Sequence, residues 1–292
     1  NLVAKLSQSL AKRVAKRPPL NPFFQRLQTD IVLCFGVRND TASIVRSCKR
    51  SGKRSVVFLT SDRNIQDACR HGKHDRGAYG EIGYLCRYAL SESDLVIAQT
   101  PYQRDALQEQ LGISAKLIRN PIDLNRRGEQ AADTPNNVPK ALWVGRADTF
   151  SKRADLCISL AERCPKLPFR MVMNNHQAEV FSQLRAIAPA NVKIVEQVPY
   201  SEIEDLFFDS RVLLNTSAAE GFPNSFLQAA KYGKPIVSLD VDPGGMLDTH
   251  GCGVCAGGNL EDMAEIVETL FANHAYYSQI SKRCLHYVQE FH

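Results

Sequence analysis

The sequence has 292 residues, of which 44% are hydrophobic and 23% charged, and its net charge is +5. This length favours two domains, and the composition is ordinary for a soluble globular protein. No apolar run approaches the roughly 20 residues that span a bilayer, which argues against a transmembrane protein.

The nine cysteines are scattered along the chain. Their odd number and wide spacing differ from the frameworks of secreted disulfide proteins, so we expect a reducing, cytoplasmic compartment. Cys252 and Cys255 form one CxxC motif, but no second pair has zinc-like spacing. We therefore interpret them as small residues that flank a buried strand, rather than as a metal or redox site.

Charge is distributed unevenly. Residues 1–123 hold 20 Lys and Arg against 11 Asp and Glu, a net charge of +9, whereas the remainder carries −4. A basic first half suits an anionic acceptor, a membrane surface or nucleic acid. The sequence contains no RNA- or DNA-reading motif and no aromatic residues interleaved with the basic ones, so we expect no nucleic-acid partner.

Residues 1–17 show the spacing of an amphipathic helix with a basic face, which Pro18 and Pro19 end. Such a helix either lies on an anionic membrane or packs on its own domain with its charges in solvent. Both interpretations are open on the sequence alone. The apolar stripe consists of Leu2, Val3, Leu6, Leu10 and Val14.

Short apolar runs come next, each separated by a segment long enough for a helix. They are Ile31–Phe35, Val56–Thr60 and Leu95–Gln99, followed by a helical pattern over Pro101–Leu111 and a short strand over Lys116–Arg119. This rhythm is typical of parallel strands joined by crossover helices.

A second alternation of strands and helices begins after a segment rich in Gly, Asn, Asp and Pro. We predict an N-terminal Rossmann-like domain at 1–123, a linker at 124–139 and a C-terminal Rossmann-like domain at 140–292. We also expect both ends to be trimmed, because Asn1 is not Met and a helical pattern still runs at His292. The expected strands are Ala141–Val144, Phe169–Met173, Val192–Val195, Val212–Asn215 and Pro235–Leu239, and the expected helices lie near 152–164, 176–188, 201–209, 224–233 and 260–272.

Open parallel sheets bind ligands beyond the carboxyl ends of their strands. Gly145 and Arg146 follow one predicted strand, with Lys152 close behind, and Ser61 and Asp62 follow a strand of the first domain. Two cations at one strand end suit a diphosphate, and glycine allows close approach of the backbone. The alternative is that these are solvated side chains at a helix entrance.

The segment Glu220–Gln228 places a carboxylate in a loop and then starts a helix. Pro223 suits a first helical turn, and Asn224 or Ser225 can cap it. The amides at such a helix start form an anion site. A capped helix with only a structural role is an equal alternative.

This segment resembles the signature of two glutamates separated by seven residues in retaining GT-B glycosyltransferases of family GT4 (glycosyl transferases group 1). Three further stretches are similar to that family in the same order, namely Ser93–Ala98, Ile118–Asp123, and Val144–Arg146 with Lys152. The resemblance covers roughly residues 90–292.

The resemblance implies an α/β GT-B fold of two doubly wound Rossmann-like domains with a cleft between them. The N-terminal domain would bind the acceptor and the C-terminal domain the nucleotide-sugar. A glycine-rich strand-to-helix turn generally opens the first domain of this fold, and none precedes Ile31. We therefore expect that domain to be incomplete.

The resemblance also implies roles for single residues: Glu220 contacts the donor sugar near the reacting carbon, Arg146 and Lys152 bind the diphosphate, and Val198 lies near the base. No metal or other cofactor is expected, because the two cations and the helix start stabilise the leaving diphosphate. The expected catalytic residues are Glu220, Arg146, Lys152 and Asp62. The expected donor-binding residues are Gly145, Arg146, Lys152, Val198, Glu220, Gly221, Phe222, Pro223, Asn224, Ser225 and Gln228.

One departure from the family pattern is Gln228, which stands where the second glutamate normally binds the ribose hydroxyls. A neutral amide holds a hydroxyl more weakly than a carboxylate, by about 1 kcal/mol or more. We therefore expect weaker or altered donor binding.

A second departure concerns the first domain. Many members of the family carry a histidine near the sugar after a strand of this domain, whereas no histidine follows the strand Val56–Thr60 here. Asp62 stands at that position instead. It either faces the sugar or acceptor, or caps a helix expected at Asn64–Arg70. His71 and His74 are interpreted as solvated loop residues.

The sequence thus predicts a cytoplasmic, retaining glycosyltransferase that moves a hexose-like unit from a nucleotide diphosphate sugar to a glycan or lipid-linked acceptor, as in polysaccharide biosynthesis. Its basic half suits peripheral contact with the inner face of an anionic membrane. The alternatives are a sugar-nucleotide epimerase of GT-B form and a degenerate, non-catalytic nucleotide-sugar-binding protein.

Overall fold

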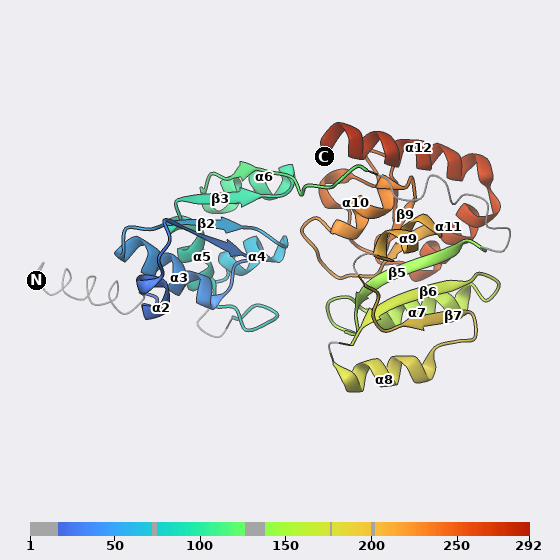
Figure 1. The fold of residues 1–292 in the computed structure, drawn as a ribbon, viewed down its shortest axis with the longest axis horizontal. Coiled ribbons are helices and arrows are strands. Elements are labelled where there is room, and N and C mark those ends of the chain that lie inside the picture. The colour runs from blue at the N-terminus through green and yellow to red at the C-terminus, as the bar shows by residue number, and fades with distance from the viewer. Residues whose placement is uncertain (1–16, 72–74, 126–137, 176, 200–201) are drawn as a thin grey trace, which may run out of the picture. The chain divides into compact units, whose positions relative to one another are not determined.

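The structure of the chain is a computed structural model that describes residues 17–71, 75–125, 138–175, 177–199 and 202–292. The chain divides into two compact units, Asn1–Ile118 and Arg119–His292, each built on its own parallel sheet (Figure 1). The amphipathic helix predicted at 1–17, apart from Arg17, and most of the predicted linker lie outside the described residues.

The first unit has a four-stranded parallel sheet in the order β1-β2-β3-β4. Val32, Cys34 and Val57 point from this sheet into a core that includes residues of α3 and α5. Its elements are α2 (Pro22–Arg26), β1 (Ile31–Phe35), α3 (Asn39–Arg50), β2 (Arg54–Phe58), α4 (Arg63–Cys69), α5 (Gly83–Glu92), β3 (Leu95–Ala98), α6 (Pro101–Leu111) and β4 (Lys116–Leu117).

Helix α6 begins and ends where the sequence predicts. The Thr100 hydroxyl accepts a hydrogen bond from the backbone N–H of Gln103 at 3.1 Å, Pro101 opens the helix, and Gly112 ends it with a φ of +66°. These are strong start and stop signals. Strand β2, in contrast, begins two residues before the predicted Val56, because Arg54 and Ser55 pair with β1 although they are polar.

One face of β1 is exposed in the described part of the chain. Ile31, Leu33 and Phe35 are 51%, 55% and 69% exposed, and Phe35 stacks on Phe58 of β2 with ring centroids 4.6 Å apart. Parallel sheets normally have both faces covered. At β1, one face of the sheet is therefore buried in the core of the first unit, and the other face is apolar and exposed.

The second unit has a six-stranded parallel sheet in the order β10-β9-β8-β5-β6-β7. Helix α10 packs against α9 and α12, whereas α11 packs against α7. The elements are β5 (Lys140–Arg146), α7 (Ala154–Arg163), β6 (Phe169–Asn174), α8 (Ala178–Ile187), β7 (Val192–Val195), α9 (Ile203–Phe208), β8 (Ser210–Asn215), α10 (Asn224–Lys231), β9 (Ile236–Ser238), the 3₁₀ turn η2 (Pro243–Gly245), β10 (Gly253–Cys255), α11 (Leu260–Ala272) and α12 (His274–Phe291).

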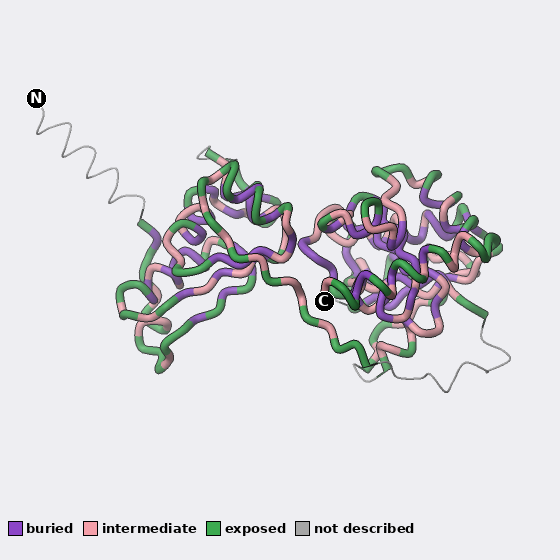
Figure 2. The backbone as a smooth tube through the Cα atoms, turned by 90° about the horizontal axis from the view of Figure 1, so that it is seen from above, coloured by how far each residue is buried: buried purple, intermediate pink, exposed green. Residues whose placement is uncertain are grey.

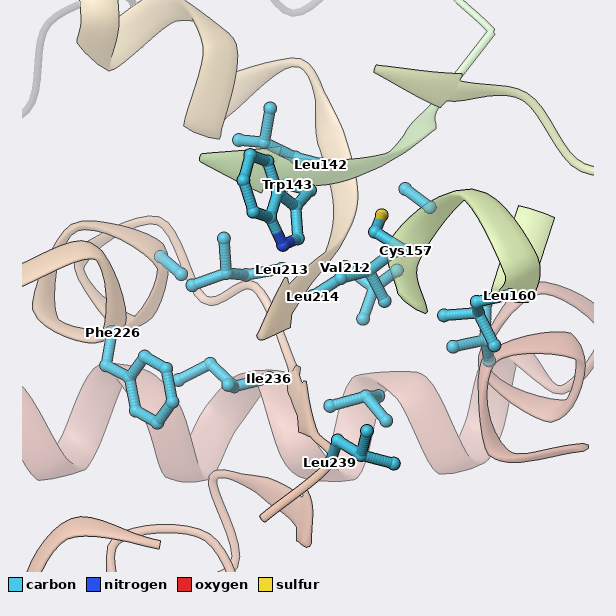
Figure 3. Packing of buried hydrophobic residues seen from close by; sticks show 14 of the residues in the cluster. Leu142, Trp143, Cys157, Leu160, Val212, Leu213, Leu214, Phe226, Ile236 and Leu239 are labelled. Carbon is cyan, nitrogen blue, oxygen red and sulfur yellow. The ribbon is translucent and has the colours of Figure 1, made fainter. Parts of the chain in front are cut away.

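Buried segments run through the middle of each unit and exposed ones along its outside (Figure 2). In the second unit, Trp143 of β5 lies in the core near Leu213 and Leu214 of β8, with Cys157 of α7 and Phe226 of α10 on opposite sides of these strands (Figure 3). Helices on both faces of a parallel sheet make a doubly wound layer structure. The α/β, Rossmann-like architecture predicted from the sequence is confirmed.

Cys252 is buried directly before β10, and Cys255 is its last residue. Among the described residues, no three His, Cys, Asp or Glu side chains gather as a metal site requires. No helix in the described ranges has the length and apolar character needed to cross a membrane.

Candidate functional site

The loop after β5 is organised by Asp148, which is 8% exposed. Its Oδ1 accepts hydrogen bonds from the backbone N–H groups of Phe150, Ser151 and Lys152 at 2.9, 2.5 and 3.2 Å. An aspartate that bonds to N–H groups a few residues further on fixes a turn. This loop therefore has a defined course from β5 to α7.

Gly145 lies in β5 beside the ring of Trp143. A Cβ atom on residue 145 would lie 2.6 Å from Trp143 Cη2, closer than two carbon atoms can approach. Trp143 Nε1 donates a hydrogen bond to the Thr216 hydroxyl at 2.9 Å. Glycine is expected here because it allows close approach of a ligand, but the indole ring of Trp143 itself requires it.

Lys152 and Glu220 form an ion pair between the Lys152 Nζ and Glu220 Oε1 atoms, with side chains 25% and 17% exposed. They lie 68 positions apart in the sequence and come from the loops after β5 and β8, which are neighbouring strands. A second link joins the same loops, because Ala218 N–H donates to Ser151 O at 2.9 Å. Two residues predicted separately are thus brought together at the carboxyl ends of the strands.

Arg146 is the last residue of β5, and its side chain is 47% exposed. Its Nη2 atom lies 3.3 Å from Asp148 Oδ2, which is a long ion pair. Because such half-exposed pairs contribute little, an anionic ligand can compete for the guanidinium.

Arg153 is the only non-glycine residue with a left-handed φ, +50°, in the described part of the chain. This conformation costs roughly 1 kcal/mol when a Cβ is present. Its Nε atom donates to Thr216 O at 2.5 Å, and Nη2 donates to Ser217 O at 3.1 Å and pairs with Asp240. The side chain spans the loops after β5, β8 and β9.

Helix α10 begins at Asn224, with Pro223 as its N-cap residue, which is earlier than a cap at Asn224 or Ser225 would allow. The prediction that Asn224 or Ser225 caps this helix is therefore wrong. The extended ψ of Pro223, 124°, excludes it from the helix, and no side-chain bond caps the first turn. The early N–H groups of α10 lack partners within the helix, as in every α-helix.

Asn120 holds this helix start. Its Nδ2 donates to Phe222 O at 3.0 Å and to Asn224 Oδ1 at 2.9 Å. The backbone O of Asn120 lies 2.7 Å from Nδ1 of His292, whose ring centroid is 5.2 Å from that of Phe222. Burial lowers the pKa of His292. The segment that precedes the linker is thereby attached to the loop that carries Glu220.

Gln228 lies one helical turn after Asn224 and is half-buried. The opposite face of α10 enters the core through Phe226, Leu227, Ala229 and Ala230. Residues four positions apart share a helix face, so Asn224 and Gln228 face the same direction.

The remaining predicted donor-binding residues are placed in different ways. Gly221, Phe222 and Pro223 are buried, and Ser225 is half-buried in the first turn of α10. Val198 follows β7 and packs against the core of the second unit. The roles of these five residues toward a ligand stay predictions.

Asp62 lies at the start of α4 in the first unit, but it makes no capping bond. Asn64 instead accepts from the N–H groups of Thr60 and Ser61, at 2.9 and 3.2 Å. Gln103 Nε2 donates to Asp62 Oδ1 at 2.9 Å, and burial raises the Asp62 pKa. The alternative that the Asp62 side chain caps this helix is wrong, because it accepts no hydrogen bond from the first turn, whereas the Ser61 hydroxyl accepts one from Arg63 N–H at 3.3 Å.

His71 lies beside Arg87, 3.4 Å from its Nη2 atom, and His74 is outside the described residues. The prediction that His71 is a solvated loop residue agrees with its exposure.

Sequence reasoning missed four polar residues that shape the site. Asp148 has a recognisable signal, since an aspartate shortly after a strand often forms a turn. Thr216, Arg153 and Asp240 have none, because their partners are backbone oxygens or side chains far along the chain.

Residues 138–273, which include β5 to α11, match the family model described as "Glycosyl transferases group 1". The sequence matches none of the curated proteins with which it was compared. The matched segment contains Arg146, Lys152 and Glu220.

The fold is similar to that of several solved structures. A mutant of S. aureus TarM, in complex with Fondaparinux, alpha-GlcNAc-glycerol and UDP, is 17% identical with a TM-score of 0.66, and the match covers 90% of this chain and 52% of that one. Sucrose-phosphate synthase from Thermosynechococcus elongatus is 15% identical with a TM-score of 0.74, covering 92% and 71%. Anabaena HepE, in complex with UDP and glucose, is 16% identical with a TM-score of 0.65, covering 89% and 73%.

This chain thus spans about half the length of TarM. The fold is of the GT-B type, and residues 138–273 of the second unit are similar to the glycosyl transferases of group 1.

Proposed function

We propose that the chain is a retaining glycosyltransferase that transfers a hexose-like unit from a nucleotide diphosphate sugar to a hydroxyl group of a glycan or lipid-linked acceptor. The observation that carries this proposal is the Lys152–Glu220 ion pair at the ends of neighbouring strands, close in sequence to the start of α10. The group 1 family match covers these residues, and the TarM mutant and HepE structures contain UDP.

The proposed reaction breaks the bond between the anomeric carbon and the diphosphate oxygen and forms a bond from that carbon to the acceptor oxygen. The diphosphate leaves with the electron pair, and the acceptor proton passes to it. Lys152 and Arg146 would oppose the negative charge that grows on the leaving group, and the N–H groups at the start of α10 would add to this.

The ion pair suggests how the sugar donor would engage the site. The Lys152 ammonium lies against Glu220. A diphosphate would draw Lys152 toward itself and free a Glu220 oxygen to accept hydrogen bonds from sugar hydroxyls. Glu220 and Lys152 would thus exchange their contact with each other for contacts with the donor.

We propose that this reaction needs no metal ion. Two cationic side chains and a helix start supply the electrostatic stabilisation that a bound Mg²⁺ supplies in other phosphate-transfer sites. Donor binding that is unchanged by EDTA would support this, and binding that requires Mg²⁺ would contradict it.

The acceptor proposal is based on charge. The net +9 of residues 1–123 suits a lipid phosphate or an acidic glycan, and it also suits peripheral contact with an anionic membrane. Binding of the full chain to vesicles that contain phosphatidylglycerol, compared with a chain that lacks residues 1–17, tests the membrane contact. Equal binding of both chains would contradict a role for that segment.

The sugar donor is identified by thermal shift with UDP-, GDP-, ADP- and TDP-sugars. A ligand at 100 times its Kd stabilises a fold by about 2.7 kcal/mol, so a specific donor raises the Tm. Lys152→Met should lose this shift, and Lys166→Met, a change of an exposed lysine in the same unit, should keep it. If no sugar donor raises the Tm of the wild type, the proposal is wrong.

Incubation with the identified donor separates the alternatives. A new sugar-nucleotide without any acceptor indicates an epimerase, and donor binding with neither transfer nor hydrolysis indicates a non-catalytic binding protein. Transfer with a retained anomeric configuration supports the proposal.

A further inference from the structure

Arg153 connects the ends of three neighbouring strands, and the proposed reaction gives it no task. Strands β9, β8 and β5 are adjacent in the sheet. Arg153 belongs to the loop after β5, its guanidinium donates to the backbone oxygens of Thr216 and Ser217 after β8, and it pairs with Asp240 after β9. Its side chain is 21% exposed.

The side chain of Arg153 makes these contacts while its backbone is strained. Its φ of +50° is one that glycine adopts without strain and that an arginine adopts only where its surroundings hold it. The three guanidinium contacts are what holds it here. Because the strained residue directly follows Lys152, its left-handed turn determines the direction in which Lys152 leaves the loop.

The bonds between the two loops run in both directions. The Thr216 hydroxyl lies 2.8 Å from Lys152 O and 2.9 Å from Arg153 O, while Arg153 donates to Thr216 O. Hydrogen bonds in both directions therefore join Thr216 to the Lys152–Arg153 segment. Glu220 lies only a few residues beyond this point on the β8 side.

We propose that Arg153 is a positioning residue of the sugar-donor site: its guanidinium clamps the loops after β5, β8 and β9, and its strained backbone directs Lys152 toward Glu220 before any ligand binds. This inference rests on the proposed function for its effect on donor binding, but the clamp itself is a property of the ligand-free protein. Asp240 neutralises and orients the guanidinium, so Arg153 serves the loops and leaves the diphosphate to Lys152 and Arg146.

The first test needs no ligand. Lysine side chains of the folded, full-length protein are labelled in competition with trace acetic anhydride, and the rate of Lys152 is compared with that of the exposed Lys166 by mass spectrometry. In the wild type, we expect contact with Glu220 to shield Lys152 from the reagent, so that it reacts more slowly than Lys166. We expect Arg153→Gly to raise the rate of Lys152 to that found in Glu220→Gln, while Lys166 is unchanged. An unchanged Lys152 rate in Arg153→Gly would overturn the inference.

Glycine is chosen because it removes the guanidinium clamp and adopts positive and negative φ equally well, so that nothing then confines residue 153 to the left-handed turn. Arg153→Lys keeps a charge but loses the fork that reaches two carbonyls and a carboxylate together, and Asp240→Asn weakens the clamp from its other end. Both should give rates between those of the wild type and Arg153→Gly. If Arg153→Gly does not fold, these two variants decide, and rates equal to the wild type in both would overturn the inference.

The second test measures UDP, GDP and ADP binding by calorimetry. Arg153→Gly should bind the preferred nucleotide about tenfold more weakly, because small misplacements of charged groups are costly. Glu261→Gln breaks the exposed ion pair with Arg163 on the same unit and should bind like the wild type. If the wild type binds no nucleotide, the proposed function fails, and the labelling result still decides whether Arg153 positions Lys152.

Discussion

Two loops of this chain follow a buried parallel strand and carry a predicted catalytic residue, yet they differ in what they bring together. The loop after β2 carries Asp62, whose carboxylate is bonded to Gln103 within the first unit. The loop after β5 carries Lys152, which meets Glu220 from the loop of the neighbouring strand. Asp62 and Lys152 both follow a strand. Of these two residues, only Lys152 pairs with an opposite charge from the loop of a neighbouring strand.

This difference shows that a polar residue after a parallel strand is not sufficient evidence of a ligand site. Ligands bind beyond the carboxyl ends of parallel strands, but polar residues there also serve the turn itself, as Asn64 and Asp148 do. Partly buried, opposite charges on neighbouring strand ends, such as Lys152 and Glu220, form a more specific signal.

The largest loss is expected from breaking the Lys152–Glu220 pair. Lys152→Met and Glu220→Gln should each reduce glycosyl transfer by about 100-fold or more, because each removes electrostatic stabilisation from the reacting groups. Since the two act together, the double variant should lose little more than either single one. Initial rates with the identified sugar donor measure this. Single-variant rates within twofold of the wild type would contradict the assigned roles.

Asn120→Ala should loosen the loop that carries Glu220. Loss of the bonds to Phe222 O and Asn224 Oδ1 should lower the free energy of unfolding by about 1–2 kcal/mol and weaken nucleotide binding by about tenfold. Denaturant unfolding and calorimetry measure the two effects.

Asn191→Ala is the matched control. Asn191 donates to the backbone oxygens of Ala161, Cys164 and Leu167, at 3.0, 3.1 and 3.0 Å, in another part of the same unit. It should lose similar stability and keep its nucleotide affinity. Equal loss of affinity in both variants would mean that Asn120 has only a general structural role.

Gln228→Glu should tighten binding of the nucleotide. If Gln228 bonds to a ribose hydroxyl, a carboxylate in its place strengthens that bond by about 1 kcal/mol, or roughly fivefold in Kd. Gln183→Glu on the exposed part of α8 adds the same charge elsewhere and should not change the Kd. An unchanged or weaker affinity in Gln228→Glu would argue against a contact with the ribose.

Asp62→Asn should have the smallest effect, with transfer rates within about twofold of the wild type, because Asp62 serves a contact inside the first unit. Burial raises the Asp62 pKa, and the hydrogen bond from Gln103 opposes this rise. A carboxyl with a raised pKa in the folded state loses stability as pH rises from its unfolded pKa through the folded one.

The wild type should therefore lose a stability contribution over that acidic range that Asp62→Asn does not lose. Near neutral pH the variant should be as stable as the wild type or more so. Unfolding curves at several pH values measure this, and a large loss of transfer activity in Asp62→Asn would show that the two loops are functionally more alike than their contacts indicate.

Much of the fold followed from local signals. Thr100, Pro101 and Gly112 determine α6 to the residue, and alternating apolar strands and helices predict both sheets. Boundaries failed where polar residues join a strand, as Arg54 and Ser55 do, or where a proline stands outside its helix, as Pro223 does. The start of β2 is decided by pairing with β1, and the start of α10 by the extended ψ of Pro223, and neither can be inferred from the local sequence.

The candidate site was predictable as a set of charged residues but not as an arrangement. Glu220 and Lys152 could be selected by their motif, yet their direct contact and the role of Asn120 depend on the register of β5 and β8. Arg153 gave no signal at all, because two of its partners are backbone oxygens, which every residue has.

Trp143 is the single tryptophan of the chain, and its indole ring lies beside Gly145 with Nε1 bonded to Thr216. Its fluorescence therefore comes from one buried position beside the end of β5 that is bonded to the loop after β8. A rearrangement at Thr216 changes the surroundings of this ring, so the protein carries a spectroscopic reporter that needs no added dye. A titration followed by emission wavelength would report on the loop after β8.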